Sequence, residues 1–169
     1  MSTRDLVKMA MYLAMFAALD VISNAFVIFR MPQGGTFGLG VIALILASYD
    51  LGPRKGIFVG LVSILVQYIT TPPLWFISWP QFFLDYILAY GIYGVAVMIP
   101  NSKAGKFPLL WGAIFVNLVR LSAHVVSGVV YYQSTWWGSF GYNGWYMIPT
   151  TIYAFILSSL LYTRLKLKK

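Results

Sequence analysis

The segment FPLLWGAIFVNLVRLSAHVVSGVVYY (residues 107–132) decides the fold class of this chain. A helix that crosses a bilayer needs about 20 predominantly apolar residues, and this segment is longer than that with Arg120 as its only permanently charged side chain. The whole chain has the same character, because 60% of its 169 residues are hydrophobic, 9% are charged and the mean hydropathy is +0.77. Soluble domains usually contain about 25% charged residues. The composition therefore predicts an integral membrane protein.

Other apolar runs resemble this segment and are separated by short stretches rich in proline, glycine and charge. The six helices that we predict cover residues 5–29, 37–49, 56–69, 80–99, 107–132 and 144–163. We therefore expect an all-α bundle of six transmembrane helices that forms a single domain over residues 1–169. These helices use nearly all of the chain, so an ATPase or a catalytic domain would have to come from another polypeptide.

The basic residues indicate how the bundle is oriented. With a cytoplasmic N-terminus and six spans, the outer loops hold only Arg30. Cytoplasmic loops of membrane proteins collect lysine and arginine, so we predict that both termini are cytoplasmic and that the net charge of +8 reflects topology and not binding to nucleic acid. The basic residues of the inner segments are Arg4, Lys8, Arg54, Lys55, Lys103, Lys106, Arg164, Lys166, Lys168 and Lys169.

The sequence also excludes or disfavours several classes of site. It has no cysteine, which excludes disulfides and thiolate metal sites, and one histidine and four acidic residues make a metal site with several ligands improbable. The chain lacks the phosphate-binding loop of nucleotide-hydrolysing proteins and any Ser–His–Asp pattern. We therefore expect no metal, no cofactor and no enzymatic activity.

A few polar residues interrupt the apolar helices over residues 80–99 and 107–132. Gln81 and Asp85 are four residues apart and therefore share one helix face. Asn117, Arg120 and His124 form a similar polar stripe. Polar and ionisable groups inside a bilayer usually face the interior of the bundle or a cavity.

Asp85 has two possible roles. It could pair with Arg120 and join the two helices, or it could face a cationic ligand within a ring of aromatic side chains, since a cation over an aromatic face gains about 2 kcal/mol when both are desolvated. The aromatic residues expected to form this ring are Tyr86, Tyr90, Trp79 and Tyr132. His124 is either a satisfied interior group or a ligand contact that donates or accepts a hydrogen bond, and Gly128 could let a flat ligand approach the backbone closely.

The outer loops are rich in tryptophan, with Trp75 and Trp79 in one loop and Trp136 and Trp137 in another. Tryptophan is common at membrane–water interfaces. These side chains are therefore either an interfacial belt or the rim of an aromatic binding site at the outer face.

Small residues recur along the first predicted helix, where Ala10, Ala14 and Ala18 are each four residues apart. Small residues at this spacing allow two helices to approach closely within a membrane. The pattern is compatible with docking of this helix onto another membrane protein.

Short motifs follow one another along the chain in the order found in a known family. The chain resembles, over nearly its whole length, the thiamine-specific substrate-binding subunit (S component) of energy-coupling factor transporters. The motifs are Ala10-x-x-x-Ala14 with Asp20, Met31-Pro-Gln-Gly-Gly35, Pro80-Gln81, Leu84-Asp85-Tyr86, Arg120, Ala123-His124-Val-Val-Ser127-Gly128, Tyr142-Asn143 and Tyr146-Met-Ile-Pro149.

The resemblance implies a six-helix, S-component-like bundle in a prokaryotic cell membrane that captures thiamine (vitamin B1) at the outer face with high affinity. Such subunits dock through the alanine face of the first helix, here Ala10, Ala14 and Ala18, onto a transmembrane coupling protein. Two cytoplasmic ATPases bound to that protein hydrolyse ATP and drive uptake. The chain itself would need no cofactor.

The resemblance also implies which residues contact the ligand. These are Asp85, Tyr86, His124, Gly128, Tyr132 and Asn143, with Gln81 beside them and Trp137 in place of a family tyrosine that aligns near Gly138. Some members have glutamate where Asp85 stands, and a family tryptophan falls near Ser63. A thiamine precursor or another cationic heteroaromatic vitamin is therefore the alternative ligand. An enzyme that uses Asp85 with His124 as an acid–base pair, or a purely structural helical subunit, are the remaining hypotheses.

Overall fold

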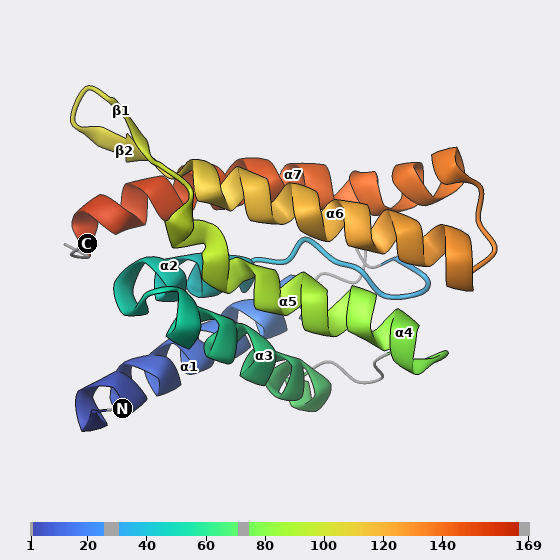
Figure 1. The fold of residues 1–169 in the computed structure, drawn as a ribbon, viewed down its shortest axis with the longest axis horizontal. Coiled ribbons are helices and arrows are strands. Elements are labelled where there is room, and N and C mark those ends of the chain that lie inside the picture. The colour runs from blue at the N-terminus through green and yellow to red at the C-terminus, as the bar shows by residue number, and fades with distance from the viewer. Residues whose placement is uncertain (1, 26–30, 71–74, 166–169) are drawn as a thin grey trace.

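The computed structural model describes residues 2–25, 31–70 and 75–165. In this part of the chain, six helical runs pass along the long axis of the molecule in alternating directions (Figure 1). The first three are α1 (Thr3–Ala25), α2 (Val41–Leu51) and α3 (Pro53–Thr70). The fourth is continuous but changes its winding, through α4 (Trp79–Phe82), the π-helical turn η2 (Phe83–Leu88), α5 (Ala89–Gly91) and the 3-10 helix η3 (Ile92–Met98). The last two are α6 (Trp111–Tyr131) and α7 (Trp136–Arg164).

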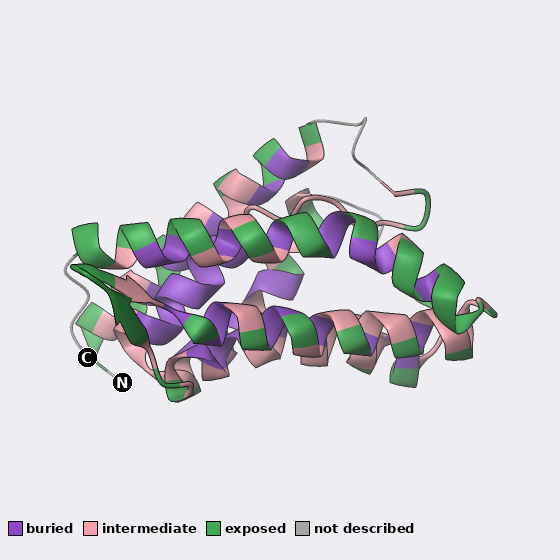
Figure 2. Ribbon diagram, turned by 90° about the horizontal axis from the view of Figure 1, so that it is seen from above, coloured by how far each residue is buried: buried purple, intermediate pink, exposed green. Residues whose placement is uncertain are grey.

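Helix α2 lies at the centre of the bundle. Its residues from Val41 to Tyr49 are all buried, and it packs against α1, α3, η3 and α7 (Figure 2). Its 11 residues span about 16 Å, roughly half of the 30 Å hydrocarbon core of a bilayer. The rest of this pass is formed by the non-helical segment 31–40, which leads into α2. The expected helix over residues 37–49 therefore begins later, at Val41.

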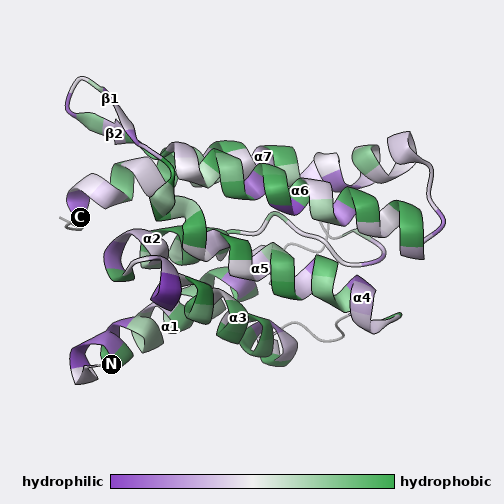
Figure 3. Ribbon diagram, viewed as in Figure 1, coloured by the Kyte–Doolittle hydropathy of each residue, from purple (hydrophilic) through white to green (hydrophobic). Residues whose placement is uncertain are grey.

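Four helical runs are long and apolar enough to cross a membrane, within the described part of the chain: Thr3–Ala25, Trp79–Met98, Trp111–Tyr131 and Trp136–Arg164. Their outward faces carry large exposed apolar side chains, among them Met11, Phe83, Val130 and Ile152. Hydrophobic residues cover most of the ribbon in Figure 3. These features are typical of a helical membrane bundle.

Both ends of the chain and the β-hairpin lie at the same end of the bundle (Figure 1). Charged residues gather there. Lys8 of α1 pairs with Asp50 at the end of α2 at 2.8 Å, and Lys55 at the start of α3 pairs with Asp5 of α1 at 2.9 Å. These ion pairs tie the first turns of α1 to the connection between α2 and α3.

The expected helix over residues 107–132 was wrong at its start. Phe107–Leu109 form strand β2, which pairs antiparallel with β1 (Ser102–Ala104), and α6 begins only at Trp111. The hairpin turns at Gly105, whose φ of +61° favours glycine. Apolar composition alone could not separate this short strand from the helix that follows it.

The start of the last helix was also wrong. We expected a loop up to residue 143 because of its glycines, but α7 begins at Trp136 and includes Gly138 and Gly141. The side chain of Thr135 caps the helix by accepting the Gly138 N–H at 3.1 Å. Glycine is common in membrane helices, so its low helix propensity misled the prediction here.

The other predicted bounds agree more closely. The helices expected at 56–69 and 80–99 correspond to Pro53–Thr70 and Trp79–Met98. Some of the expectations fall outside the described residues. They concern the end of the first helix near Phe29, the outer-loop residue Arg30, the break at residues 71–73 and the terminal lysines.

Candidate ligand-binding site

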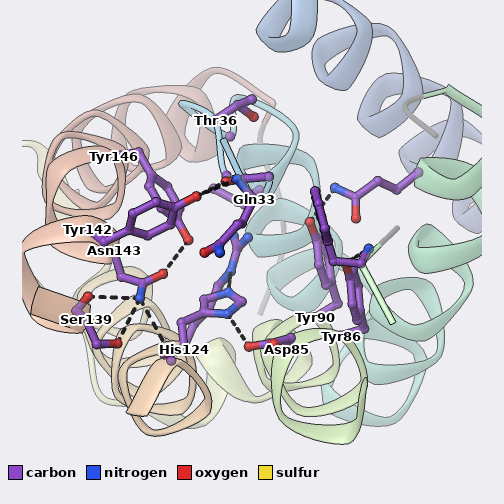
Figure 4. Close-up of a pocket in the computed structure, with 18 of the residues that line it drawn as sticks. Gln33, Thr36, Asp85, Tyr86, Tyr90, His124, Ser139, Tyr142, Asn143 and Tyr146 are labelled. Atoms are coloured by element: carbon purple, nitrogen blue, oxygen red, sulfur yellow. Dashed lines mark hydrogen bonds and ion pairs between the residues drawn. The ribbon is translucent and has the colours of Figure 1, made fainter. Parts of the chain in front are cut away.

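A cavity of about 390 Å³ is lined by residues from the half of the bundle away from the chain termini. Figure 4 shows the side chains that line it. Its walls come from α1, segment 31–40, α3, η2, α5, α6 and α7. Residues far apart in the sequence, such as Gln33, Asp85 and Asn143, face one another across it. Ligand pockets of proteins usually enclose about 300–1,000 Å³, so this cavity can hold a molecule with two small rings.

Asp85 lies in the π-helical turn η2 and lines the cavity. Its Oδ2 accepts hydrogen bonds from Gln81 Nε2 at 2.7 Å and from Ser127 Oγ at 2.6 Å. Its Oδ1 lies 2.8 Å from Nδ1 of His124. Single π-helical turns within α-helices often occur at functional sites, and this one turns the carboxylate toward α6.

His124 lies between Asp85 and Arg120. While Nδ1 faces Asp85, Nε2 accepts a hydrogen bond from Arg120 Nε at 3.2 Å. The ion pairs among the described residues do not join Asp85 directly to Arg120, so direct pairing of these two residues, one of the alternatives from the sequence, is not what the structure shows. His124 and Asp85 form the pair instead, and each side chain is 12% exposed.

Aromatic side chains line the cavity near Asp85. The ring of Tyr86 stacks on Phe82 at 4.9 Å, and its hydroxyl accepts the backbone N–H of Trp75 at 2.9 Å. Tyr132 follows α6, and its hydroxyl accepts a hydrogen bond from Gln81 Nε2 at 3.4 Å. Burial and then the charge of nearby Asp85 raise the pKa of the Tyr132 phenol to about 12. The phenol therefore remains a neutral hydrogen-bond donor at physiological pH.

Helix α7 and segment 31–40 form the opposite wall. The Tyr142 hydroxyl accepts the backbone N–H of Gln33 at 2.9 Å and donates to the carbonyl of Gly34 at 3.1 Å. Gly34 and Gly35 have φ angles of +86° and +92°, which favour glycine. A Cβ at Gly35 would also lie only 2.7 Å from the ring of Tyr146. These contacts hold the non-helical segment against α7.

Asn143 extends this wall between His124 and Tyr146 (Figure 4). Its Nδ2 donates to the carbonyl of Ser139 at 3.0 Å and of His124 at 3.4 Å, and its Oδ1 accepts from the Tyr146 hydroxyl at 2.8 Å. The amide thereby joins α6 to α7 at the cavity surface.

The residues expected at the site divide into three groups. Those that line the cavity together are Asp85, Tyr86, His124, Gly128, Tyr132 and Asn143. Gln81 is fully buried behind the wall and holds Asp85. Trp137, by contrast, is 84% exposed in the first turn of α7 and is not among the lining residues, and the same holds for the 75% exposed Trp79.

Gly128 has a packing role that differs from the one suggested by the sequence. A Cβ at this position would overlap Oγ of Ser139 on α7. The glycine is therefore required for the close contact of α6 and α7, and the exposed part of its backbone forms the cavity surface there.

Arg120 and Asp20 also line the cavity, although neither was expected to contact the ligand. Arg120 packs over the rings of Tyr90 and Tyr93, with its guanidinium carbon 4.9 Å and 5.8 Å from their centres. Asp20 of α1 also lines the cavity, where its Oδ2 accepts a hydrogen bond from Thr70 at 2.8 Å. Its position on the buried face of an apolar helix was a signal that could have identified it. No group of His, Cys, Asp and Glu suited to a metal ion occurs among the residues described.

The alanines of α1 lie outside the site. Ala10, Ala14 and Ala18 are all exposed and follow one face of the helix. Large exposed apolar residues, among them Val7, Met11 and Val21, accompany them on the outer side of α1.

Comparison with known proteins adds to this geometry. Residues 6–169 match the family described as Thiamine transporter protein (Thia_YuaJ). The chain is also similar to "Thiamine transporter ThiT" of Bacillus subtilis (strain 168), with 31% identity over 174 residues that include 93% of this chain and 89% of the relative.

Proposed function

The chain belongs to the thiamine transporter protein family, and from this premise we propose that it captures thiamine for uptake as the substrate-binding subunit of an energy-coupling factor importer. The family consists of transporters and not of enzymes. The observation that carries the proposal is the carboxylate of Asp85, which lines a cavity with aromatic walls and is held by Gln81, Ser127 and His124.

The charge of the cavity supports a cationic ligand. Asp85 places a carboxylate on the cavity wall, where Gln81, Ser127 and His124 hold it. Thiamine carries one permanent positive charge on its thiazolium ring. The carboxylate of Asp85 would attract this charge.

The hydrogen bonds of Asp85 favour a particular kind of cation. An ionised carboxylate offers about four acceptor positions, and the protein already uses three through Gln81, Ser127 and His124. A protonated amine needs several acceptors, whereas the quaternary nitrogen of thiazolium has no N–H and needs only charge and close packing. A carboxylate already bonded in this way therefore suits a quaternary cation better than an ammonium group.

The remaining walls suit a flat second ring. Tyr86, Tyr90, Trp75 and Tyr146 provide aromatic surface, and aromatic stacking contributes about 0.5–1.5 kcal/mol per pair beyond the buried area. Polar groups of segment 31–40 and α7 are present on the wall opposite Asp85 (Figure 4). An aminopyrimidine ring, which both donates and accepts hydrogen bonds, matches this combination.

In the proposed orientation, the chain crosses the cell membrane six times with both termini cytoplasmic. The basic residues near the chain termini, among them Lys8, Lys55 and Arg164, would lie in the cytoplasm, as the distribution of basic residues in membrane proteins favours. The cavity would then open toward the outer side. The alanine face of α1 would contact the membrane coupling protein, and two cytoplasmic ATPases would supply the energy.

Thiamine titration of the detergent-purified protein tests the proposal. Isothermal calorimetry should show saturable binding of thiamine at one site, and Trp75 on the cavity wall should report it as quenched fluorescence. The separate pyrimidine and thiazole alcohols and a panel of other vitamins serve as competitors. Tighter binding of one of these would assign a different ligand, and no binding of any would reject a capture function.

A further inference from the structure

We propose that Arg120 is a positioning residue that holds His124 in its neutral Nδ1–H tautomer and so reserves the negative charge of Asp85 for the ligand. The effect on ligand binding rests on the proposed function, whereas the tautomer is a property of the ligand-free protein. Hydrogen bonds run from Arg120 through His124 to Asp85.

Arg120 determines the protonation state of Nε2 of His124. A guanidinium group has N–H donors and no acceptor. Because Arg120 Nε donates to Nε2 at 3.2 Å, this ring nitrogen must offer its lone pair and cannot carry a proton.

The single ring proton of neutral His124 is therefore on Nδ1. A neutral imidazole has one N–H, which must therefore be on Nδ1, 2.8 Å from Oδ1 of Asp85. Both ring nitrogens of His124 are then engaged within the protein. His124 therefore affects the ligand through Asp85.

Buried partners hold Arg120 in place. Its Nη1 donates to the Tyr93 hydroxyl at 3.1 Å, and that hydroxyl donates to Oδ1 of Asn117 at 2.8 Å. The guanidinium also packs on the rings of Tyr90 and Tyr93. Arg120 is only 8% exposed, so its Nε cannot turn away from His124 without leaving buried partners unsatisfied.

Arg120 also disfavours the protonated form of His124. A second proton on His124 would put an N–H against the N–H of Arg120 and place two positive charges side by side. It would also turn the contact with Asp85 into a neutral ion pair, which would remove the attraction for a cationic ligand. The other titratable side chains that line the cavity around His124 are Asp20 on α1, Tyr86 and Tyr90 on the fourth helix, Tyr132 after α6, and Tyr142 and Tyr146 on α7.

The tautomer can be measured directly, because the chain has one histidine. The protein is labelled with ¹⁵N-histidine and purified on a histidine-free tag. Its NMR spectrum should show one protonated and one unprotonated ring nitrogen. The couplings of these nitrogens to the carbon-bound ring protons should assign the N–H proton to Nδ1. This pattern should persist without ligand between about pH 8 and pH 5, a range that spans the titration of an unperturbed histidine. An Nε2–H tautomer or an imidazolium at neutral pH would overturn the proposal, whether or not thiamine binds.

Variants test the role of Arg120. In Arg120→Met, both ring nitrogens should become protonated as the pH falls, and thiamine affinity should drop roughly tenfold or more between pH 8 and pH 5, because each pH unit below a titration midpoint changes the neutral fraction about tenfold. Wild-type affinity should change little over this range. Ser127→Ala is the matched control, since it removes a donor to Asp85 but leaves the contact with Arg120 intact. An unchanged tautomer and a flat pH profile in Arg120→Met would overturn the proposal, and if that variant does not fold, the wild-type spectrum still decides.

Discussion

The substitution Asp85→Asn gives the sharpest test of how this site recognises charge. The side chain of Asp85 is 12% exposed, so an effective dielectric constant of about 20 is appropriate. A full charge at about 4 Å from the ligand's cation then contributes about 4 kcal/mol, against about 1 kcal/mol in water. Because the unbound ligand and protein do not interact, we expect the substitution to remove about 4 kcal/mol, which corresponds to a fall in thiamine affinity of roughly 1,000-fold.

The hydrogen bonds around Asp85 limit the side effects of this change. An asparagine oxygen can still accept from His124, and the hydroxyl of Ser127 can turn to accept from the new amide. The amide of Gln81 would then lose its carboxylate acceptor and face the N–H group of the new asparagine. This mismatch should cost about 1–3 kcal/mol in stability. Thermal unfolding of the variant in detergent measures this cost separately from binding.

A neutral isostere of thiamine, with a thiophene in place of the thiazolium ring, provides the control. Calorimetric titration of both ligands against both proteins forms a cycle in which Asp85→Asn should weaken thiamine strongly and leave the isostere almost unchanged. An equal loss for the two ligands would mean that Asp85 only supports the architecture of the site. No loss for either would remove it from recognition altogether.

Three further substitutions test other parts of the structure. Gly128→Ala should lower the free energy of unfolding by about 1–3 kcal/mol through overpacking against Ser139, as measured by thermal unfolding; Ser139→Gly in the same chain should restore much of it, and no rescue would contradict the packing account. Trp137→Phe should leave thiamine affinity within about twofold, because the side chain is exposed and away from the cavity; a large loss in the titration would place Trp137 at the site after all. Ala14→Trp should leave thiamine binding by the isolated chain intact but abolish uptake in vesicles that contain the coupling protein and ATPases, because the bulky ring prevents close helix contact. Leu65→Trp, at another exposed position, is its control, and equal uptake by both variants would argue against docking through α1.

The sequence predicted much of the site because polar groups are so rare in its helices. Asp85 and His124 were identifiable as polar residues in apolar helices, whereas Asn143 was expected only from the family resemblance, and all three line the cavity. The i,i+4 relation of Gln81 to Asp85 also correctly placed the two side chains in contact. What the pattern could not show was that Arg120 reaches Asp85 only through His124, since this depends on the tyrosines that hold the guanidinium.

Other features were hidden from the sequence for physical reasons. A π-helical turn such as Phe83–Leu88 depends on packing around it and has no periodic signal. Segment 31–40 looked like a loop followed by the start of a helix, yet it forms a cavity wall because Tyr142 binds its backbone. Trp137 was expected at the site by analogy with a family position, but the early start of α7 turns it outward.

The short central helix α2 has an electrical consequence. Non-helical backbone at membrane depth must border water or protein, and polar residues of segment 31–40 line the cavity. In the proposed orientation, a water-filled cavity would be nearly at the potential of the outer solution. The membrane voltage would then fall mainly across the buried side chains of Val41–Leu51. A monovalent guest that enters the cavity experiences little of the roughly 2.3 kcal/mol per 100 mV that a full crossing involves. Capture should therefore be almost independent of voltage, and most of that energy is exchanged only when the guest passes α2.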